Sequence, residues 1–318
     1  MYLCHGLQSP LKGGIHFLLL VVLCHIARSE CFAQNITYGI ESLDRLGSAA
    51  KPYAPEFFGK REKLTRFGLA ISGDGRECYF AVALTDGGRF REEIRLTRRN
   101  ADGEWSTPQP LLRSEKQYKY VDPHFSPDGK RLYFIYTKPE NGKPRNQRFD
   151  IWFVERTGKG WGEPVNIGAP ISTIDAEEYF VSLTSEGTIF FGSNRSDPDN
   201  FDLYSARLGK NDRYDQPVPL PGKVNTNNYE ADVFVAPDES YVVFSSSGRE
   251  DGRGQGDLYV SFKDSDGNWS AGRNLGDRVN SNRQEFAPSI SRDQKALFFS
   301  RGGVLYWVST KVIEDLRP

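Results

Sequence analysis

The sequence is poor in the residues that typify metalloenzymes and disulfide-bonded modules. Its 318 residues include four histidines and four cysteines, and beyond residue 33 only Cys78 and His124 remain. That part of the chain therefore has neither an intramolecular disulfide nor a multi-histidine metal site. The G-x-S-x-G nucleophile elbow of the α/β-hydrolases and the S-x-D-x-G-x-T-W Asp-box of the sialidases are absent too.

Two further absences concern charge and periodicity. Lysine and arginine number 41 against 42 aspartates and glutamates, and no basic stripe or tail interrupts this balance. Nucleic acid is therefore not expected as a partner. No segment sustains the 3.6-residue apolar period of a helix, which excludes helical solenoids. Aromatic residues reach 13%, mostly Tyr and Phe, and this composition favours β-sheet.

The first 33 residues predict a secretory signal peptide. Lys12 precedes the apolar run from Ile15 to Ile26, and small residues at Cys31 and Ala33 form a cleavage site. A retained anchor is the alternative, but the run is short for a membrane span. We therefore expect one domain over residues 34–318, exported to the periplasm or secreted, with no membrane span and no cofactor. We expect it to be a monomer.

Self-similarity is the strongest pattern in the chain. Five segments share a turn flanked by apolar strands, as in HFSPDGKRLYF and VFVAPDESYVVF. The sequence Ser126-Pro127-Asp128-Gly129 suits a type I turn, so each repeat begins with a hairpin. The acidic residues of the five turns lie 52 to 58 positions apart: Asp74, Asp128, Glu186, Asp238 and Asp293.

Each repeat then continues with a third strand and a short fourth strand. Four antiparallel strands in about fifty residues make one propeller blade. The fifth repeat ends after three strands, and the segment Tyr53–Gly59 resembles the missing closing strand. The sequence thus predicts an all-β, five-bladed propeller of four-stranded antiparallel blades, closed by an N-terminal strand. A six-bladed propeller would need residues 36–66 to form most of another blade, and this segment looks too short.

These repeats resemble the WD40-like Pro-Asp repeat, which forms the propeller of TolB and of many exported bacterial proteins. The similarity rests on HFSPDGKRLYF, on FVAPDESYVVFSSSGR and on the D-L-Y strands that follow. It covers nearly all of the chain beyond the signal. It implies a fold and leaves the activity open, because this fold hosts many unrelated activities.

The first strand of each blade lines the central channel of a propeller. Strict alternation along these strands assigns several charged and aromatic residues to the channel side. Arginines from the loops between the second and third strands lie at the same face. The predicted ligand-binding residues at this channel mouth are Tyr120, Asp122, His124, Glu178, Glu230, Asp232, Glu285, Arg195, Arg249 and Arg301.

Two interpretations of these charges remain open. In the first, the acidic ring binds a cation or a polyhydroxylated ligand. In the second, each glutamate pairs with the arginine of its own blade, so that the ring only holds loops in place. The second interpretation predicts three ion pairs: Glu178 with Arg195, Glu230 with Arg249, and Glu285 with Arg301.

Other recurring polar residues have structural interpretations. Asp150, Asp202 and Asp257 begin the third strands, which is typical of loop capping. Asp197, Asp199 and Asp202 form an oxygen-rich loop that is a weak candidate for calcium, since it lacks EF-hand spacing. Asn225 and Asn280 recur just ahead of the channel glutamates, as turn formers or as residues exposed to a ligand.

Two functions remain. The repeats and the missing catalytic motifs predict a non-catalytic binding or scaffold module, for a protein partner or an envelope glycan at the channel-opening face. The alternative is a carbohydrate-active hydrolase or lyase that uses channel carboxylates such as Glu230 and Asp232. An enzyme of this kind requires at least one carboxylate without an arginine partner and with a raised pKa.

Overall fold

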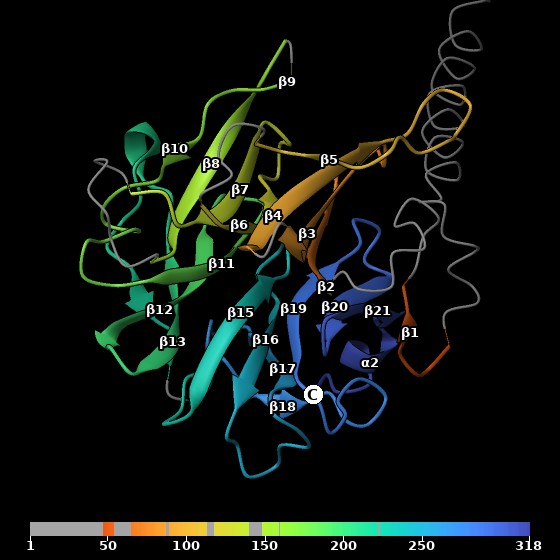
Figure 1. Ribbon diagram of the computed structural model, residues 1–318. Helices are drawn as coiled ribbons and strands as arrows, with labels where there is room; N and C mark the ends of the chain where they lie inside the picture. The colour runs from red at the N-terminus through yellow and green to blue at the C-terminus, as the bar shows by residue number, and fades with distance from the viewer. Residues whose placement is uncertain are drawn as a thin grey trace, which may run out of the picture. The chain divides into compact units, whose positions relative to one another are not determined.

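A computed structural model describes residues 47–53, 65–86, 89–112, 118–139, 148–158, 160–221 and 223–318. The predicted signal peptide over residues 1–33 lies outside these ranges. Five antiparallel sheets follow one another along the chain and surround a common axis (Figure 1). The predicted five-bladed propeller is thereby confirmed, and each sheet is called a blade below.

The first three blades each use consecutive stretches of chain. Blade 1 comprises β2 (Thr65–Ile71), β3 (Glu77–Asp86), β4 (Arg89–Arg98) and β5 (Gln109–Pro110). Blade 2 comprises β6 (Tyr120–Phe125), β7 (Arg131–Tyr136), β8 (Asp150–Thr157) and β10 (Val165–Asn166), with β9 (Gly160–Trp161) paired to β8. Blade 3 comprises β11 (Glu178–Leu183), β12 (Ile189–Asp197), β13 (Asn200–Ala206) and β14 (Val218–Pro219), and a 3₁₀ turn (Lys210–Asp212) precedes β14.

The last two blades complete the ring. Blade 4 comprises β15 (Tyr229–Val235), β16 (Tyr241–Ser247), β17 (Asp257–Phe262) and β18 (Arg273–Asn274). Blade 5 comprises β19 (Glu285–Ile290), β20 (Ala296–Arg301), β21 (Val304–Ser309) and the N-terminal strand β1 (Lys51–Pro52). A short helix, α2 (Lys311–Glu314), follows β21. Among the described residues, no helix is long and apolar enough to cross a membrane.

The hairpin turns follow the expected chemistry. In blade 2 the Ser126 hydroxyl donates to Asp128 at 2.7 Å, and the Gly129 amide donates to the Ser126 carbonyl at 2.9 Å. Gly129 has φ of 69°, which a residue without a side chain adopts most readily. The aspartate side chain accepts hydrogen bonds within the turn. This motif therefore stabilises the hairpin without a contribution from the residues that line the channel.

The ring closes through the N-terminal strand, two residues earlier than predicted. Lys51 and Pro52 pair with β21, and the Tyr53 amide donates to the Leu305 carbonyl at 2.8 Å. The Tyr53 ring then packs edge-on against Phe298, with 5.0 Å between ring centroids. Proline is tolerated at this position because β1 is an edge strand. Residues 54–59 of the predicted strand lie outside the described ranges.

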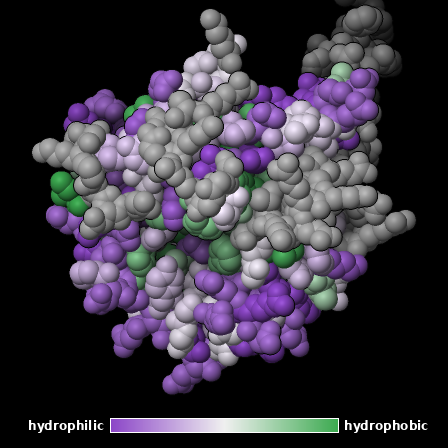
Figure 2. All heavy atoms as spheres, in the orientation of Figure 1, coloured by the Kyte–Doolittle hydropathy of each residue, from purple (hydrophilic) through white to green (hydrophobic). Residues whose placement is uncertain are grey.

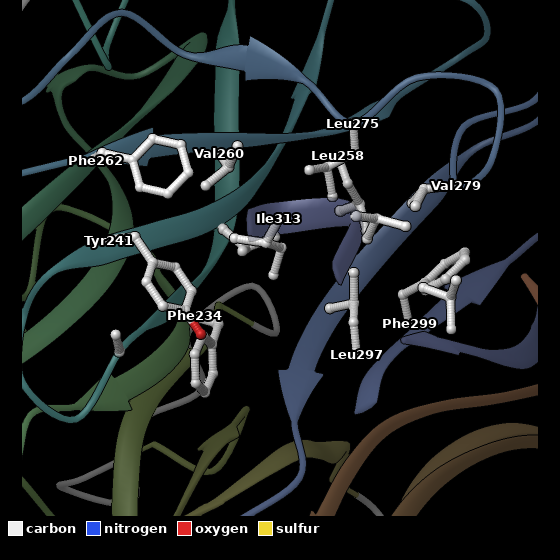
Figure 3. Packing of buried hydrophobic residues seen from close by; sticks show 14 residues of the cluster. Phe234, Tyr241, Leu258, Val260, Phe262, Leu275, Val279, Leu297, Phe299 and Ile313 are labelled. Carbon is white, nitrogen blue, oxygen red and sulfur yellow. The ribbon is translucent and has the colours of Figure 1, made fainter. Parts of the chain in front are cut away.

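Apolar side chains fill the spaces between adjoining blades. Figure 3 shows the cluster between blades 4 and 5, where Val260 and Leu258 from β17 lie near Leu297 and Phe299 from β20. Ile313 of α2 is fully buried in the same cluster. Burial of these side chains is the main force holding neighbouring blades together. It also fixes the inner strands, which carry the channel residues.

Candidate functional site

Each innermost strand contains one residue with left-handed backbone geometry at the same place. These residues are Gly68, Asp122, Phe180, Asp232 and Ala287, with φ between 47° and 56°. In every blade the pairing register shifts at this point. A β-bulge of this kind changes the direction of the side chains and interrupts their alternation. The strict alternation assumed from the sequence therefore fails at this point in all five inner strands.

Two of these five positions carry carboxylates, one in blade 2 and one in blade 4. Asp122 lies against blade 1, where a Cβ atom added at Gly68 would be only 2.9 Å from its Oδ1. Asp232 leans toward blade 5 and accepts hydrogen bonds from the Ala287 amide at 3.3 Å and from the Ser245 hydroxyl at 3.2 Å. Within the described residues neither carboxylate forms an ion pair with an arginine or lysine.

The two aspartates differ in their readiness to ionise. Burial raises the pKa of Asp122 well above its usual range, and the charges of Asp232 and Glu92 raise it further. Burial also raises the pKa of Asp232, to about 6, while its hydrogen bonds from Ala287 and Ser245 act in the opposite direction. The proton is therefore held more strongly on Asp122 than on Asp232. Pairs of carboxyl groups with separated pKa values are typical of acid–base sites.

His124 lies on the same strand as Asp122 and is held in one tautomer. The Leu183 amide donates to its Nε2 atom at 3.3 Å. An accepting Nε2 means that Nδ1 carries the proton. Burial lowers the pKa of His124 to about 4. The imidazole is therefore neutral at pH 7 and serves as a hydrogen-bond donor rather than as a cation.

The three predicted glutamate–arginine pairs are present. Glu178 is 3.1 Å from Arg195, Glu230 is 2.9 Å from Arg249, and Glu285 is 2.8 Å from Arg301. All three glutamates are fully buried. We call each pair an entry clamp, since it lies where the first strand of blades 3, 4 and 5 begins.

Each entry clamp has further partners, and those of blade 4 engage both glutamate oxygens. In blade 4 the Arg249 guanidinium also donates to the Val224 carbonyl at 2.6 Å and lies over the Tyr259 ring at 4.6 Å from its centroid. Glu230 accepts from Thr226 and Ser246 as well. Glu230 was a candidate catalytic carboxylate, but its oxygens are already engaged. Only the aspartates of the ring meet the requirement for a carboxylate without an arginine.

Tyr120 has a different location from that predicted. It is 2% exposed and packs between the rings of Phe134 and Tyr136 in the core of blade 2. Its hydroxyl donates to the Leu112 carbonyl at 3.0 Å. Tyr120 thus belongs to the core rather than to the channel. Tyr120 comes before the bulge in β6. At this point the alternation of side chains along the strand places the tyrosine side chain between the blades.

The recurring asparagines also have structural partners. Asn225 accepts from the Leu203 amide at 2.8 Å and donates to the Leu203 carbonyl at 3.0 Å. Asn280 makes the same two hydrogen bonds with Leu258. Each asparagine thus mimics a strand partner for the third strand of the preceding blade. The sequence indicated turn formation here, but not this link between blades.

The candidate calcium loop lies at the end of β12. Asp197 accepts the Asp199 amide at 3.0 Å, and both side chains are exposed. Asp202 is half-buried, and the charges of Glu230 and Asp197 add to the effect of burial in raising its pKa. In the described parts of the chain, no group of three or more histidine, cysteine, aspartate or glutamate side chains is arranged to hold a metal ion.

A chain of four aromatic rings, which we call the aromatic path, runs along the face where the inner strands begin. The centroid distances are 5.2 Å from Phe149 to Tyr179, 4.9 Å from Tyr179 to Phe201, and 5.4 Å from Phe201 to Tyr229. The charges of Asp232 and Asp122 act on Tyr179, and that of Asp232 acts on Tyr229. Tyr229 is the exposed end of the aromatic path, and two of its four rings lie within the electrostatic influence of Asp232.

Sequence reasoning missed this aromatic path, although a signal for it exists. Phe149 and Phe201 each precede a recurring aspartate, and Tyr179 and Tyr229 each adjoin a clamp glutamate. Figure 2 shows a hollow near the middle of the face in view, with apolar residues around it. Apolar walls with a few convergent polar groups are typical of ligand sites.

A second concavity lies away from the channel, between blades 2 and 3. This groove has a volume of about 520 Å³ and is lined by Arg131, Tyr133, Glu155 and Tyr214 among others. Its charged groups already satisfy one another, because Arg131 is 3.0 Å from Glu155 and lies over the Phe153 ring at 4.9 Å. The groove therefore lacks the unpaired buried carboxylates that distinguish the channel.

Comparison with known proteins agrees with the fold. No family model and no curated protein matches the chain, so its resemblance to the Pro-Asp repeat stays a prediction. Among solved structures, the endo-arabinase from Bacteroides thetaiotaomicron has a TM-score of 0.49 at 12% identity, with 76% of this chain and 92% of that chain covered. The GH62 α-L-arabinofuranosidase of Coprinopsis cinerea has a TM-score of 0.48 at 11% identity, covering 84% and 99%.

A gluconolactonase from Xanthomonas campestris is also similar, with a TM-score of 0.45, 13% identity, and 71% of that chain covered by 76% of this one. All three of these proteins are enzymes by name, contrary to the prediction of a non-catalytic binding or scaffold module, which is therefore not retained. At such low identity the likeness shows the fold alone, so the reaction has to be argued from this chain's own residues.

Proposed function

We propose that the protein is a carbohydrate-active hydrolase in which Asp122 and Asp232 form the acid–base pair. The observation that carries this proposal is that buried Asp122 and half-buried Asp232 have no arginine partner among the described residues, whereas three neighbouring glutamates each have one. A structural carboxylate is normally neutralised where it is buried. Two that are not neutralised, and whose pKa values separate, are suited to proton transfer.

The roles follow from the protonation states. Asp122, which holds its proton, donates it to the glycosidic oxygen as the bond from that oxygen to the anomeric carbon breaks. A water oxygen forms the new bond to that carbon, and ionised Asp232 removes the proton that the water loses. If Asp232 instead bonds to the anomeric carbon first, water cleaves that covalent intermediate in a second step, and Asp122 accepts the proton that this water loses. In both courses one water molecule adds across the glycosidic bond.

The surroundings of the pair suit a polyhydroxylated substrate. The aromatic path offers ring faces on which the C–H face of a sugar can pack, close to the two carboxylates. The Nδ1–H of His124 is a neutral donor that can orient a hydroxyl group without adding charge. Export to the periplasm or outside the cell, which the N-terminal segment predicts, would place such an enzyme where polysaccharides occur.

The test is to assay the purified protein and two variants against a panel of plant, algal and bacterial polysaccharides, following new reducing ends. Asp122→Asn and Asp232→Asn should each reduce turnover by roughly 10²- to 10⁴-fold. Asp238→Asn is the matched control, because it removes one carboxylate of the same blade from the turn between β15 and β16. Turnover that survives both channel substitutions, or a panel with no substrate at all, would count against the proposal.

A further inference from the structure

Negatively charged side chains surround Asp122. Besides Asp232 itself, Glu92 contributes to the field at Asp122, and Glu177 acts on the nearby hydroxyls of Tyr179 and Tyr229. Glu177 is half-buried, and its backbone amide donates to the side-chain oxygen of Asn194 at 2.8 Å. Low-dielectric walls strengthen such a field because water is displaced from them. A ligand entering the channel meets this field first.

Four basic side chains on this face already have acidic partners. Arg195, Arg249 and Arg301 each bind a buried glutamate and a backbone carbonyl, and Lys119 is 3.0 Å from Glu92. Each guanidinium of the three entry clamps also lies over an aromatic ring. To bind an anionic ligand, an arginine would have to leave a carboxylate buried and unpaired, which is strongly unfavourable.

From this arrangement we infer that the channel takes glycans that carry no carboxylate or sulfate groups, and that it repels uronic acids and sulfated sugars. This inference rests on the proposed hydrolase function, whose substrate class it narrows. A neutral sugar presents hydroxyl groups to Asp232 and His124 and stacks on the aromatic path. An anionic sugar brings like charges together in a poorly hydrated site, which discriminates against it.

The same arrangement bears on the choice between a hydrolase and a lyase. Eliminative cleavage of a polysaccharide removes the proton next to the carboxylate of a uronic acid, and a cation or several donors must stabilise the charge that develops. Within the described residues the aspartate pair has hydrogen-bond donors from Ala287 and Ser245 but no unengaged guanidinium. Hydrolysis needs no such cation, because Asp122 donates its proton to the leaving oxygen and thereby neutralises the negative charge that develops there.

The experiment measures binding by calorimetry, so that it does not depend on turnover. A panel of neutral and anionic oligosaccharides is titrated into the wild-type protein, into Asp232→Asn and into the control Asp238→Asn. The strongest neutral ligand is then oxidised at a primary hydroxyl to a carboxylate, which gives a pair of probes that differ only in charge. We expect the oxidised probe to bind roughly tenfold more weakly or worse. The difference in affinity between the neutral and the oxidised probe should become smaller at high salt and in Asp232→Asn.

The outcomes separate this inference from the proposed function. An anionic sugar could bind as tightly as its neutral partner and be cleaved in a way that depends on Asp122 and Asp232. This result would support the hydrolase function and contradict the preference for neutral sugars. If neutral sugars bind more tightly than anionic ones but both asparagine variants turn over substrate normally, Asp122 and Asp232 are not catalytic. The preference for neutral sugars is then a property of binding in the channel. If no oligosaccharide binds, or if Asp238→Asn reduces the difference in affinity as much as Asp232→Asn, the inference is overturned.

Discussion

Asp232 accepts a hydrogen bond from the backbone amide of Ala287, 3.3 Å away, and the two residues occupy the same left-handed position in adjoining blades. The bulge at Ala287 interrupts the pairing of β19 with β20 between Phe286 and Ser289. Its amide is thereby available to a side chain instead of the sheet. This donor and the Ser245 hydroxyl only partly compensate the half-buried carboxylate, so the pKa of Asp232 stays raised at about 6.

The stability of the protein should increase when Asp122 is replaced by asparagine. Because burial raises its folded-state pKa, the native state keeps this proton to a higher pH than the unfolded chain does. Stability from this group is therefore lost as pH rises from the unfolded pKa toward the folded one. Asparagine removes that loss, so we expect Asp122→Asn to have a higher Tm than the wild type at pH 7. This difference in Tm, measured by thermal unfolding, should become smaller toward pH 4.

The control for this measurement is Asp238→Asn. Although partial burial opposes it, hydrogen bonds from the Ser240 hydroxyl and amide lower the pKa of Asp238. Its contribution is present above the unfolded pKa and is lost as pH falls through the folded one. Asp238→Asn should therefore destabilise slightly at neutral pH. A neutral-pH loss of stability in Asp122→Asn would mean that this carboxyl group has a structural role.

The pH dependence of kcat/KM should be bell-shaped. On the acid side the rate should rise through about pH 6, because Asp232 must be ionised and its pKa is raised to that value. On the alkaline side it should fall as Asp122 loses its proton. This profile reports the free enzyme's ionisations. An acid limb near pH 4, typical of an ordinary carboxylate, would remove Asp232 from its assigned role.

The entry clamps should respond differently from the aspartates. Arg249→Met leaves Glu230 buried without its cation, and we expect a loss of about 3 to 5 kcal/mol in the free energy of unfolding. The double variant Arg249→Met/Glu230→Gln should recover part of this loss, because no uncompensated charge then remains. Denaturant unfolding measures both. Equal losses in the single and double variants would show that packing of the arginine, rather than its charge, stabilises the blade.

Gly68 and Ala287 offer a matched pair of backbone tests. Gly68→Ala adds a Cβ atom 2.9 Å from Asp122 Oδ1 at a φ of 53°, so it should destabilise the protein by at least about 1 to 2 kcal/mol and displace the carboxylate. Ala287→Gly relieves the same φ and should stabilise by up to about 1 kcal/mol. Turnover should fall in the first variant and persist in the second. Unchanged turnover in Gly68→Ala would separate Asp122 from catalysis.

Much of the architecture could be predicted from local patterns. The Ser-x-Asp turns, the apolar strands beside them and the unfinished fifth repeat depend on residues close in sequence, and they correctly predicted five blades closed by the N-terminus. The three glutamate–arginine pairs could also be predicted, since each pair lies on the first hairpin of one blade. The pairing is a matter of sheet register, which hydrophobic alternation and turn position determine.

The channel site was decided by the tertiary structure. Asp122, Glu230 and Tyr120 look alike in the sequence as alternating positions of an inner strand, yet one faces the channel, one is clamped by arginine and one packs in the core. What separates them is a bulge whose position no local pattern marks, together with the approach of other blades. The sequence by itself determined the blades and their clamps, because these need only neighbours within a repeat. Only the closed ring brings Asp122 near Asp232, since their interaction needs two blades that are not consecutive.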